Sequence, residues 1–132
     1  MTLDDLETAL GQHLTGMTNC PPIVWMNKDA EPSLPYLRFR HDPVSRIAPT
    51  LAKDIAPDQV GLVIVTIVTQ SDTFTTEANV LAEQVADRFP EGLRLAAGSG
   101  NILIDRSEPV AGLLDDRNNW TVPVRIRYRT DT

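Results

Sequence analysis

The chain has 132 residues, a length that fits one domain over residues 1–132 and suffices for a hydrophobic core without disulfide staples. Its 12 basic and 18 acidic residues give a net charge of −6, which excludes a general nucleic-acid binder that relies on a net basic surface. A single cysteine excludes an intrachain disulfide and a four-cysteine zinc site.

The first residues carry no secretion signal, because Asp4, Asp5 and Glu7 stand where positive charge and an apolar run would be needed. The longest apolar run, residues 61–68, is too short to cross a bilayer. We therefore expect the chain to stay in the cytoplasm where it is made, with no membrane partner.

A short amphipathic helix is predicted at the start of the chain. Thr2 can cap it, with Asp5 three residues later, and Gly16 followed by Pro21-Pro22 ends it. One apolar stripe runs along this helix at spacings of three and four residues: Leu3, Leu6, Leu10, Leu14 and Met17.

Residues 23–26 are predicted as a brief strand, and residues 28–35 as a turn-rich link. Residues 36–41 then alternate like a half-buried strand, with Arg38 and Arg40 on one face.

Residues 42–57 form the longest irregular stretch expected in the chain. This stretch is too apolar for a solvated linker, so it either folds back onto the core or contacts a partner. Its aliphatic residues are Val44, Ile47, Leu51 and Ile55.

Residues 60–69 give the strongest strand prediction, because β-branched residues dominate them. Both faces of this strand are apolar, which is typical of a central strand covered on both sides. We expect helices on one face and something else, such as another subunit, on the other. The two faces carry Leu62, Ile64 and Val68, and Val63, Val65 and Ile67.

A second helix is predicted from a cap among residues 71–75 to Phe89, since Pro90 and Gly92 stop it. Its apolar stripe is Ala78, Leu81, Val85 and Phe89.

Two further strands are predicted, over residues 101–105 and 120–129, separated by a loop over residues 107–118. In the last strand Pro123 cannot donate a ladder hydrogen bond, so we expect an edge strand or a bulge there. The arginines of this strand, Arg125, Arg127 and Arg129, share one face.

This order of elements predicts an α+β fold. We expect a two-layer sandwich, with a mainly antiparallel sheet of about four or five strands and two helices packed on one face.

The sequence contains no catalytic constellation, and no cofactor or metal site is predicted. His13 is expected on a helix flank, and His41, beside Asp42, at a solvated strand end. Cys20 is expected to be a small half-buried residue. The Gly98–Gly100 segment lies between a helix and a strand, whereas a phosphate-binding loop should open a helix, so we interpret it as a turn.

One charge pattern remains without a structural explanation. Five of the basic residues fall on the faces of two strands in an acidic protein: Arg38, Arg40, Arg125, Arg127 and Arg129. They form either a solvated sheet face or a surface for self-association, and without interleaved aromatic residues a nucleic-acid role is disfavoured.

The chain resembles a family of small phage tail terminator proteins over about residues 3–129. The resemblance lies in the order and spacing of several landmarks. These are Ile23-Val24-Trp25-x-Asn27, Pro32, Tyr36-Leu37-Arg38, the Gly61-led apolar strand, Phe89-Pro90-Glu91-Gly92, and the last strand from Trp120 to Tyr128.

The resemblance implies a structural protein of the virion tail, assembled in the host bacterial cytoplasm, and not an enzyme. Such proteins form a ring, usually a homohexamer, that caps the tail tube, stops its growth and joins it to the head connector. The expected partners are further copies of the chain, the tail-tube protein and the connector. Candidate interface residues are Arg38, Arg40, Ile47, Leu51, Arg125, Arg127 and Arg129.

Two alternatives stay open at this stage. One is another neck or connector protein, or a tail-tube subunit. The other is a small ligand-binding domain or enzyme, with His41, Asp42 and the loop over residues 42–57 as its candidate site.

Overall fold

The computed structural model describes residues 2–28, 32–47, 58–72 and 74–131. Helix α1 (Leu3–Thr15) begins at a complete capping box. The Asp5 amide donates to the Thr2 hydroxyl over 3.1 Å, and the Thr2 amide donates to the Asp5 carboxylate over 2.9 Å. These bonds satisfy amides that a helix start leaves free, and Gly16 caps the other end, so the predicted start and end of this helix are confirmed.

Helix α2 (Thr76–Arg88) is held by tertiary packing more than by its cap. Thr75 is the N-cap residue, but its side chain makes no capping hydrogen bond. The helix instead buries one face against the sheet through small and branched residues, which let the backbones approach closely. These residues are Ala78, Ala82 and Val85, followed by the fully buried Phe89.

In the described ranges, seven strands form a single sheet in the order β1-β2-β3-β7-β5-β4, with β6 paired to β7. Among the strand pairs of the described residues, only β1–β2 is parallel. The strands are β1 (Ile23–Val24), β2 (Tyr36–Ile47), β3 (Asp58–Thr69), β4 (Arg94–Ala97), β5 (Gly100–Pro109), β6 (Leu113–Leu114) and β7 (Trp120–Asp131).

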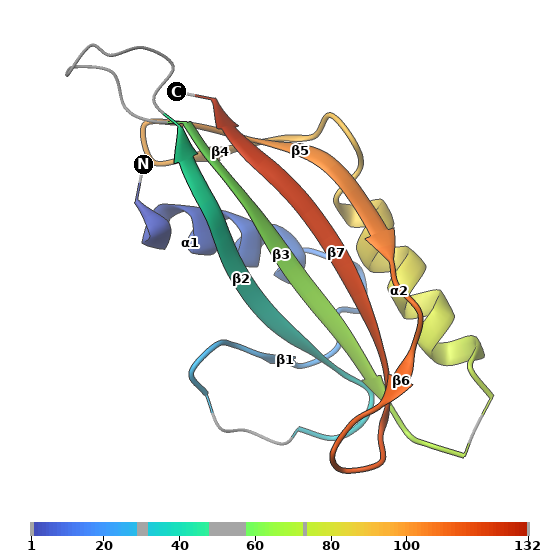
Figure 1. Cartoon of the computed structure of the whole chain (residues 1–132). Helices are drawn as coiled ribbons and strands as arrows, with labels where there is room; N and C mark the ends of the chain where they lie inside the picture. Colours follow the sequence, from blue (N-terminus) through green and yellow to red (C-terminus); the bar gives the residue numbers. More distant parts are fainter. Residues whose placement is uncertain (1, 29–31, 48–57, 73, 132) are drawn as a thin grey trace.

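The predicted two-layer sandwich with four or five strands is therefore wrong. The protein is mostly sheet, and its seven strands curl like a half-barrel around two helices (Figure 1). The strands absent from the prediction are β4 and β6, which have four and two residues. Segments this short contain too few residues to show the two-residue alternation by which a strand is recognised in a sequence.

Strand β2 also extends further than expected, to Ile47, so residues 42–47 of the predicted loop belong to the sheet. The pairing with β3 shifts register between Pro43 and Ser45. A bulge of this kind lets a strand continue past a residue without an amide proton.

The prediction that the last strand lies at an edge is wrong, since β7 pairs with both β3 and β5. Pro123 is tolerated because β5 ends at Pro109, opposite Val124. The Pro123 carbonyl accepts a hydrogen bond from the Val110 amide over 2.8 Å. The backbone of Pro123 therefore faces the side of β7 on which the β5–β7 ladder has just ended. A missing amide proton leaves no ladder partner unsatisfied there.

The core lies between the helices and the inner face of the sheet. Inward-facing residues of the central strands alternate with outward-facing ones, as their spacing predicts. Fully buried members include Leu6, Leu10 and Leu14 of α1, Val85 of α2, Val63, Val65 and Ile67 of β3, and Val124, Ile126 and Tyr128 of β7.

Candidate functional site

The outer face of the sheet, turned away from the core, carries the predicted arginines. Leu37 and Phe39 of β2 are buried in the core while Arg38 and Arg40 point outward, and β7 repeats the pattern around Ile126. Six arginines on three strands make up this surface, here called the arginine face: Arg38, Arg40, Arg106, Arg125, Arg127 and Arg129.

Strand β3 separates the two predicted rows of arginines. Ile64 pairs with Arg40 on one side and Arg125 on the other, and Leu62 pairs with Arg127. Both aliphatic side chains are only half-buried. The arginine face thus has an apolar strip with basic residues on either side, whereas the helices cover the other face of β3.

Carboxylates neutralise part of the arginine face. Arg40 pairs with Asp42 over 2.9 Å, Arg106 with Glu108 over 3.2 Å and Arg129 with Asp105 over 3.3 Å. The remaining pair, Arg38 with Asp115, is separated by 4.0 Å.

Arg125 and Arg127 keep an excess of positive charge. Neither makes an ion pair with any residue that the structure describes, and both are exposed. Arg127 also lies directly opposite Arg106 in the β5–β7 ladder, where like charges repel. A carboxylate-bearing partner would relieve this repulsion.

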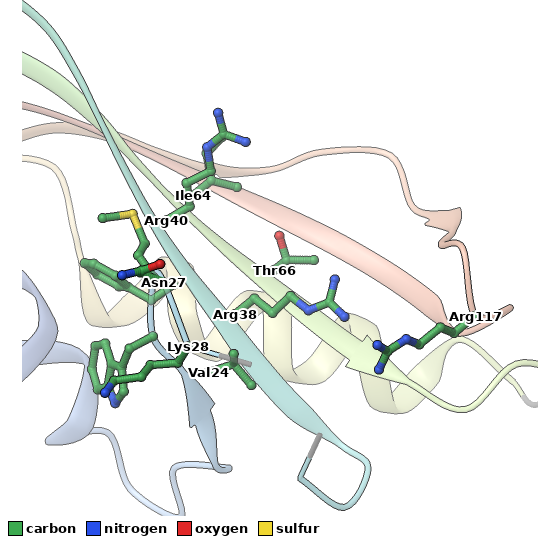
Figure 2. Close-up of a pocket in the computed structure, with 11 residues that line it drawn as sticks. Val24, Asn27, Lys28, Arg38, Arg40, Ile64, Thr66 and Arg117 are labelled. Carbon is green, nitrogen blue, oxygen red and sulfur yellow. The ribbon is translucent and has the colours of Figure 1, made fainter. Parts of the chain in front are cut away.

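A cavity of about 570 Å³ opens where the arginine face meets the β1 edge (Figure 2). Arg38 and Arg117 extend toward one another across it, and Ile64 and Thr66 form part of its wall. Four basic side chains and two half-exposed apolar ones therefore line one hollow: Lys28, Arg38, Arg40 and Arg117, with Trp25 and Met26. We call it the basic pocket.

The sequence analysis did not identify the basic pocket. Residues 25–28 are far from Arg117 in the chain, and only the parallel β1–β2 pair and the β6–β7 turn bring them together. The sequence shows only that Lys28 follows closely on Trp25 and Met26. This short pattern is also typical of an ordinary turn, so it does not predict a pocket.

His41 is buried, so the expectation of a solvated strand end is wrong. Its Nδ1 lies 3.0 Å from Oε1 of Glu7, and its Nε2 is hydrogen-bonded to the Tyr128 hydroxyl. Because a carboxylate only accepts, Nδ1 donates to Glu7, and Nε2 makes the second hydrogen bond with the phenol. Asp42 pairs with Arg40 instead, so this histidine ties α1, β2 and β7 together.

Burial raises the pKa of Tyr128 to about 12, and the charge of Glu7 adds to the shift. Burial likewise raises the pKa of the half-buried Cys20 thiol, which keeps it protonated and unreactive.

His13 and Arg88 join the two helices. His13 Nε2 donates to the Arg88 carbonyl over 2.6 Å, and Arg88 Nε donates to the His13 carbonyl over 2.8 Å. Burial lowers the pKa of His13, and the Arg88 charge adds to this while the hydrogen bond opposes it. His13 therefore lies on the flank of α1 as predicted, and its two hydrogen bonds with Arg88 hold it against α2.

The other sequence candidates are structural. Gly98 lies in the β4–β5 turn at a φ of 53°, which confirms the predicted turn. The Asp115 carboxylate accepts from the Arg117 and Asn119 amides, over 2.9 and 2.8 Å, and orders the β6–β7 turn. Within the described ranges, no group of three or more His, Cys, Asp or Glu residues is arranged to hold a metal ion.

Of the remaining interface candidates, Leu51 lies outside the described residues, and Ile47 ends β2. Neither described helix has the length and apolar character needed to span a membrane.

Comparison with known families identifies this architecture. Residues 5–128 match the model of the phage tail terminator protein family. The chain belongs to this family. It is therefore a structural protein of the phage tail, and the suspected resemblance is confirmed over most of its length.

Solved structures share the fold of this tail terminator family member. One, whose name states no function, has a TM-score of 0.77 and 21% sequence identity, and the match covers 100% of this chain and 97% of that one. Another, from the virion of a native gene transfer agent particle, has a TM-score of 0.68 and 14% identity, covering 96% and 95% of the two chains. No curated protein matches.

Proposed function

We propose that this protein ends the growth of a phage tail tube. Several copies, in a hexameric ring, would cap the finished tube and present a surface to the head connector. The match of residues 5–128 to the tail terminator family is the observation that carries this proposal.

The distribution of charge supports self-association. The helices carry exposed or half-buried carboxylates, among them Asp4, Glu7, Glu77 and Glu83, whereas the arginine face is basic. A closed ring needs two different, complementary surfaces on each subunit. A basic sheet face and an acidic helix layer meet that requirement, and they would also guide the encounter of two copies.

The arrangement of the arginine face is also suited to an interface. Ile64 and Leu62 form an apolar centre, and Arg125 and Arg127 are charged groups without carboxylate partners among the described residues. Interfaces commonly combine a dry apolar centre with a polar rim. We infer that Arg38, Arg40, Arg125, Arg127 and Arg129 contact a neighbouring subunit or the tube.

The double variant Arg125→Glu/Arg127→Glu tests this role. Both side chains are exposed, so the free energy of unfolding should change little, while ring formation and tube capping should be strongly reduced. The control is Arg125→Lys/Arg127→Lys, which keeps the charge. Light scattering reports the ring, and electron microscopy of tails reports tube length.

Particles without the protein should carry tails of uncontrolled length. Tails of normal length in its absence would refute the terminator function. Long filaments formed by the purified protein alone would instead indicate a tail-tube subunit.

A further inference from the structure

One aromatic side chain of the described residues is left almost wholly outside the packed subunit. Phe74, in the link between β3 and α2, is 93% exposed, the highest value among the large hydrophobic residues of the described chain. Asp72 and Glu77 on either side of it are also exposed. We call Asp72, Phe74 and Glu77 the acidic aromatic turn.

Such a side chain is costly to leave in water. Burying a phenylalanine is among the larger favourable contributions available to a protein contact, and aromatic residues are enriched at the centres of interfaces. Asp72 has a φ of 57°, so the backbone takes a left-handed conformation at the start of the acidic aromatic turn. A partner surface for this turn needs an apolar hollow for the ring and cations for the two carboxylates.

The basic pocket offers both features. Trp25 and Met26, each 37% exposed, supply apolar surface, and Lys28 supplies exposed positive charge. The Arg40 side chain pairs with Asp42 but is itself 69% exposed, so it can also meet a carboxylate of a partner. Its volume of about 570 Å³ lies in the range of pockets that enclose a compact ligand. We propose that the acidic aromatic turn of one copy docks in the basic pocket of the next copy, an inference that rests on the proposed ring.

The positions of the two surfaces favour a ring over a dimer. The basic pocket lies at the β1 edge of the sheet, whereas the link from β3 to α2 projects on the side of α2, away from β1 (Figure 1). Two different surfaces on separate sides of a subunit give a head-to-tail contact, which closes into a ring when the rotation allows.

A second hollow is the competing receptor for Phe74. It is mostly apolar and is lined by Pro22, Leu34 and Val80. However, Glu77 also lines it, so it lies beside the acidic aromatic turn and would set carboxylates of two copies close together. Neighbouring surfaces that pair reciprocally give an isologous dimer, not a ring.

Single-surface variants test the proposal. Phe74→Ala removes the ring from the turn, and Lys28→Glu/Arg40→Glu reverses the charge of the pocket through exposed side chains that leave the core intact. Phe74→Ala should weaken ring formation at least about tenfold, because burial of one phenylalanine contributes that much or more. Lys28→Glu/Arg40→Glu should also weaken it, because the reversed charges repel Asp72 and Glu77 of the next copy. Leu113→Ala, at a residue that is 55% exposed on β6 and lines neither hollow, is the matched control and should assemble normally.

Mixing the two assembly-defective variants gives the sharpest result. The Phe74→Ala chain keeps an intact pocket, and the Lys28→Glu/Arg40→Glu chain keeps an intact turn. In an equal mixture, the intact turn of one variant should dock in the intact pocket of the other. Assembly should then stop at a one-to-one heterodimer, because the next contact would have to join the altered turn to the altered pocket. Sedimentation measures the mass of the assembly in the mixture. If rings form only on tube ends, the capping of tubes by each variant is measured instead.

The outcomes separate the inference from the terminator function. Normal rings or normal capping by Phe74→Ala would refute the docking contact and leave the terminator function standing. Loss of assembly in Leu34→Ser or Val80→Ser, with the pocket variants unaffected, would assign Phe74 to the apolar hollow instead. A wild-type chain that neither forms rings nor caps tubes would refute both.

Discussion

Gly61→Ala should destabilise the fold through a single clash. Gly61 lies opposite Tyr128 in the β3–β7 ladder, and the phenol crosses over it to reach His41 on β2. A Cβ at this position would lie 2.7 Å from Cε1 of Tyr128 and closer still to its hydroxyl. Real Cβ atoms are not found at such separations, so the ring must move.

The cost has two parts. Overpacking a core costs about 1–3 kcal/mol. Moving the phenol also separates it from His41, and a buried polar group without a partner costs about 1–3 kcal/mol more. The sum, about 2–6 kcal/mol, is a large share of the stability of a typical domain.

Urea unfolding of a double-mutant cycle with Tyr128→Leu checks this mechanism. Leucine has no atoms at the clashing positions, so Gly61→Ala should cost about 1 kcal/mol or less in that background. An equal cost of Gly61→Ala in both backgrounds would show that the tyrosine is not what the new methyl group meets.

Two further predictions concern stability. Thr2→Ala removes the capping box and should lower the free energy of unfolding by about 1 kcal/mol, whereas Thr8→Ala, on an exposed position of the same helix, should not lower it. Between pH 10 and about 12 the folded protein holds the Tyr128 proton that the unfolded chain has lost, so stability falls as the pH rises through this window. Between these pH values the free energy of unfolding of Tyr128→Phe should fall by up to about 2 kcal/mol less than that of the wild type. An equal fall in the two proteins would contradict this.

The sequence was most informative where a pattern was long. Helix α1 shows its cap and its stripe within thirteen residues, and β3 shows a run of β-branched residues. In both cases the local signal and the tertiary role agree.

The errors arose where a residue's role depends on distant neighbours. Pro123 predicts an edge strand or a bulge because it cannot donate, but the end of β5 removes the need for a donor there. The pattern around His41 predicts a solvated strand end, because the residues that contact it in the fold are distant in the sequence. Glu7 and Tyr128 lie 34 and 87 positions away. The basic pocket depends in the same way on the position of β1 beside β2.

The place of β7 in the sheet has a consequence for synthesis in the cell. This strand inserts between β3 and β5, yet the ribosome makes it after both of them. Until it emerges, the edges of β3 and β5 that pair with β7 in the complete sheet have no partner strand. The sheet of the subunit is thus complete only when translation has passed β7.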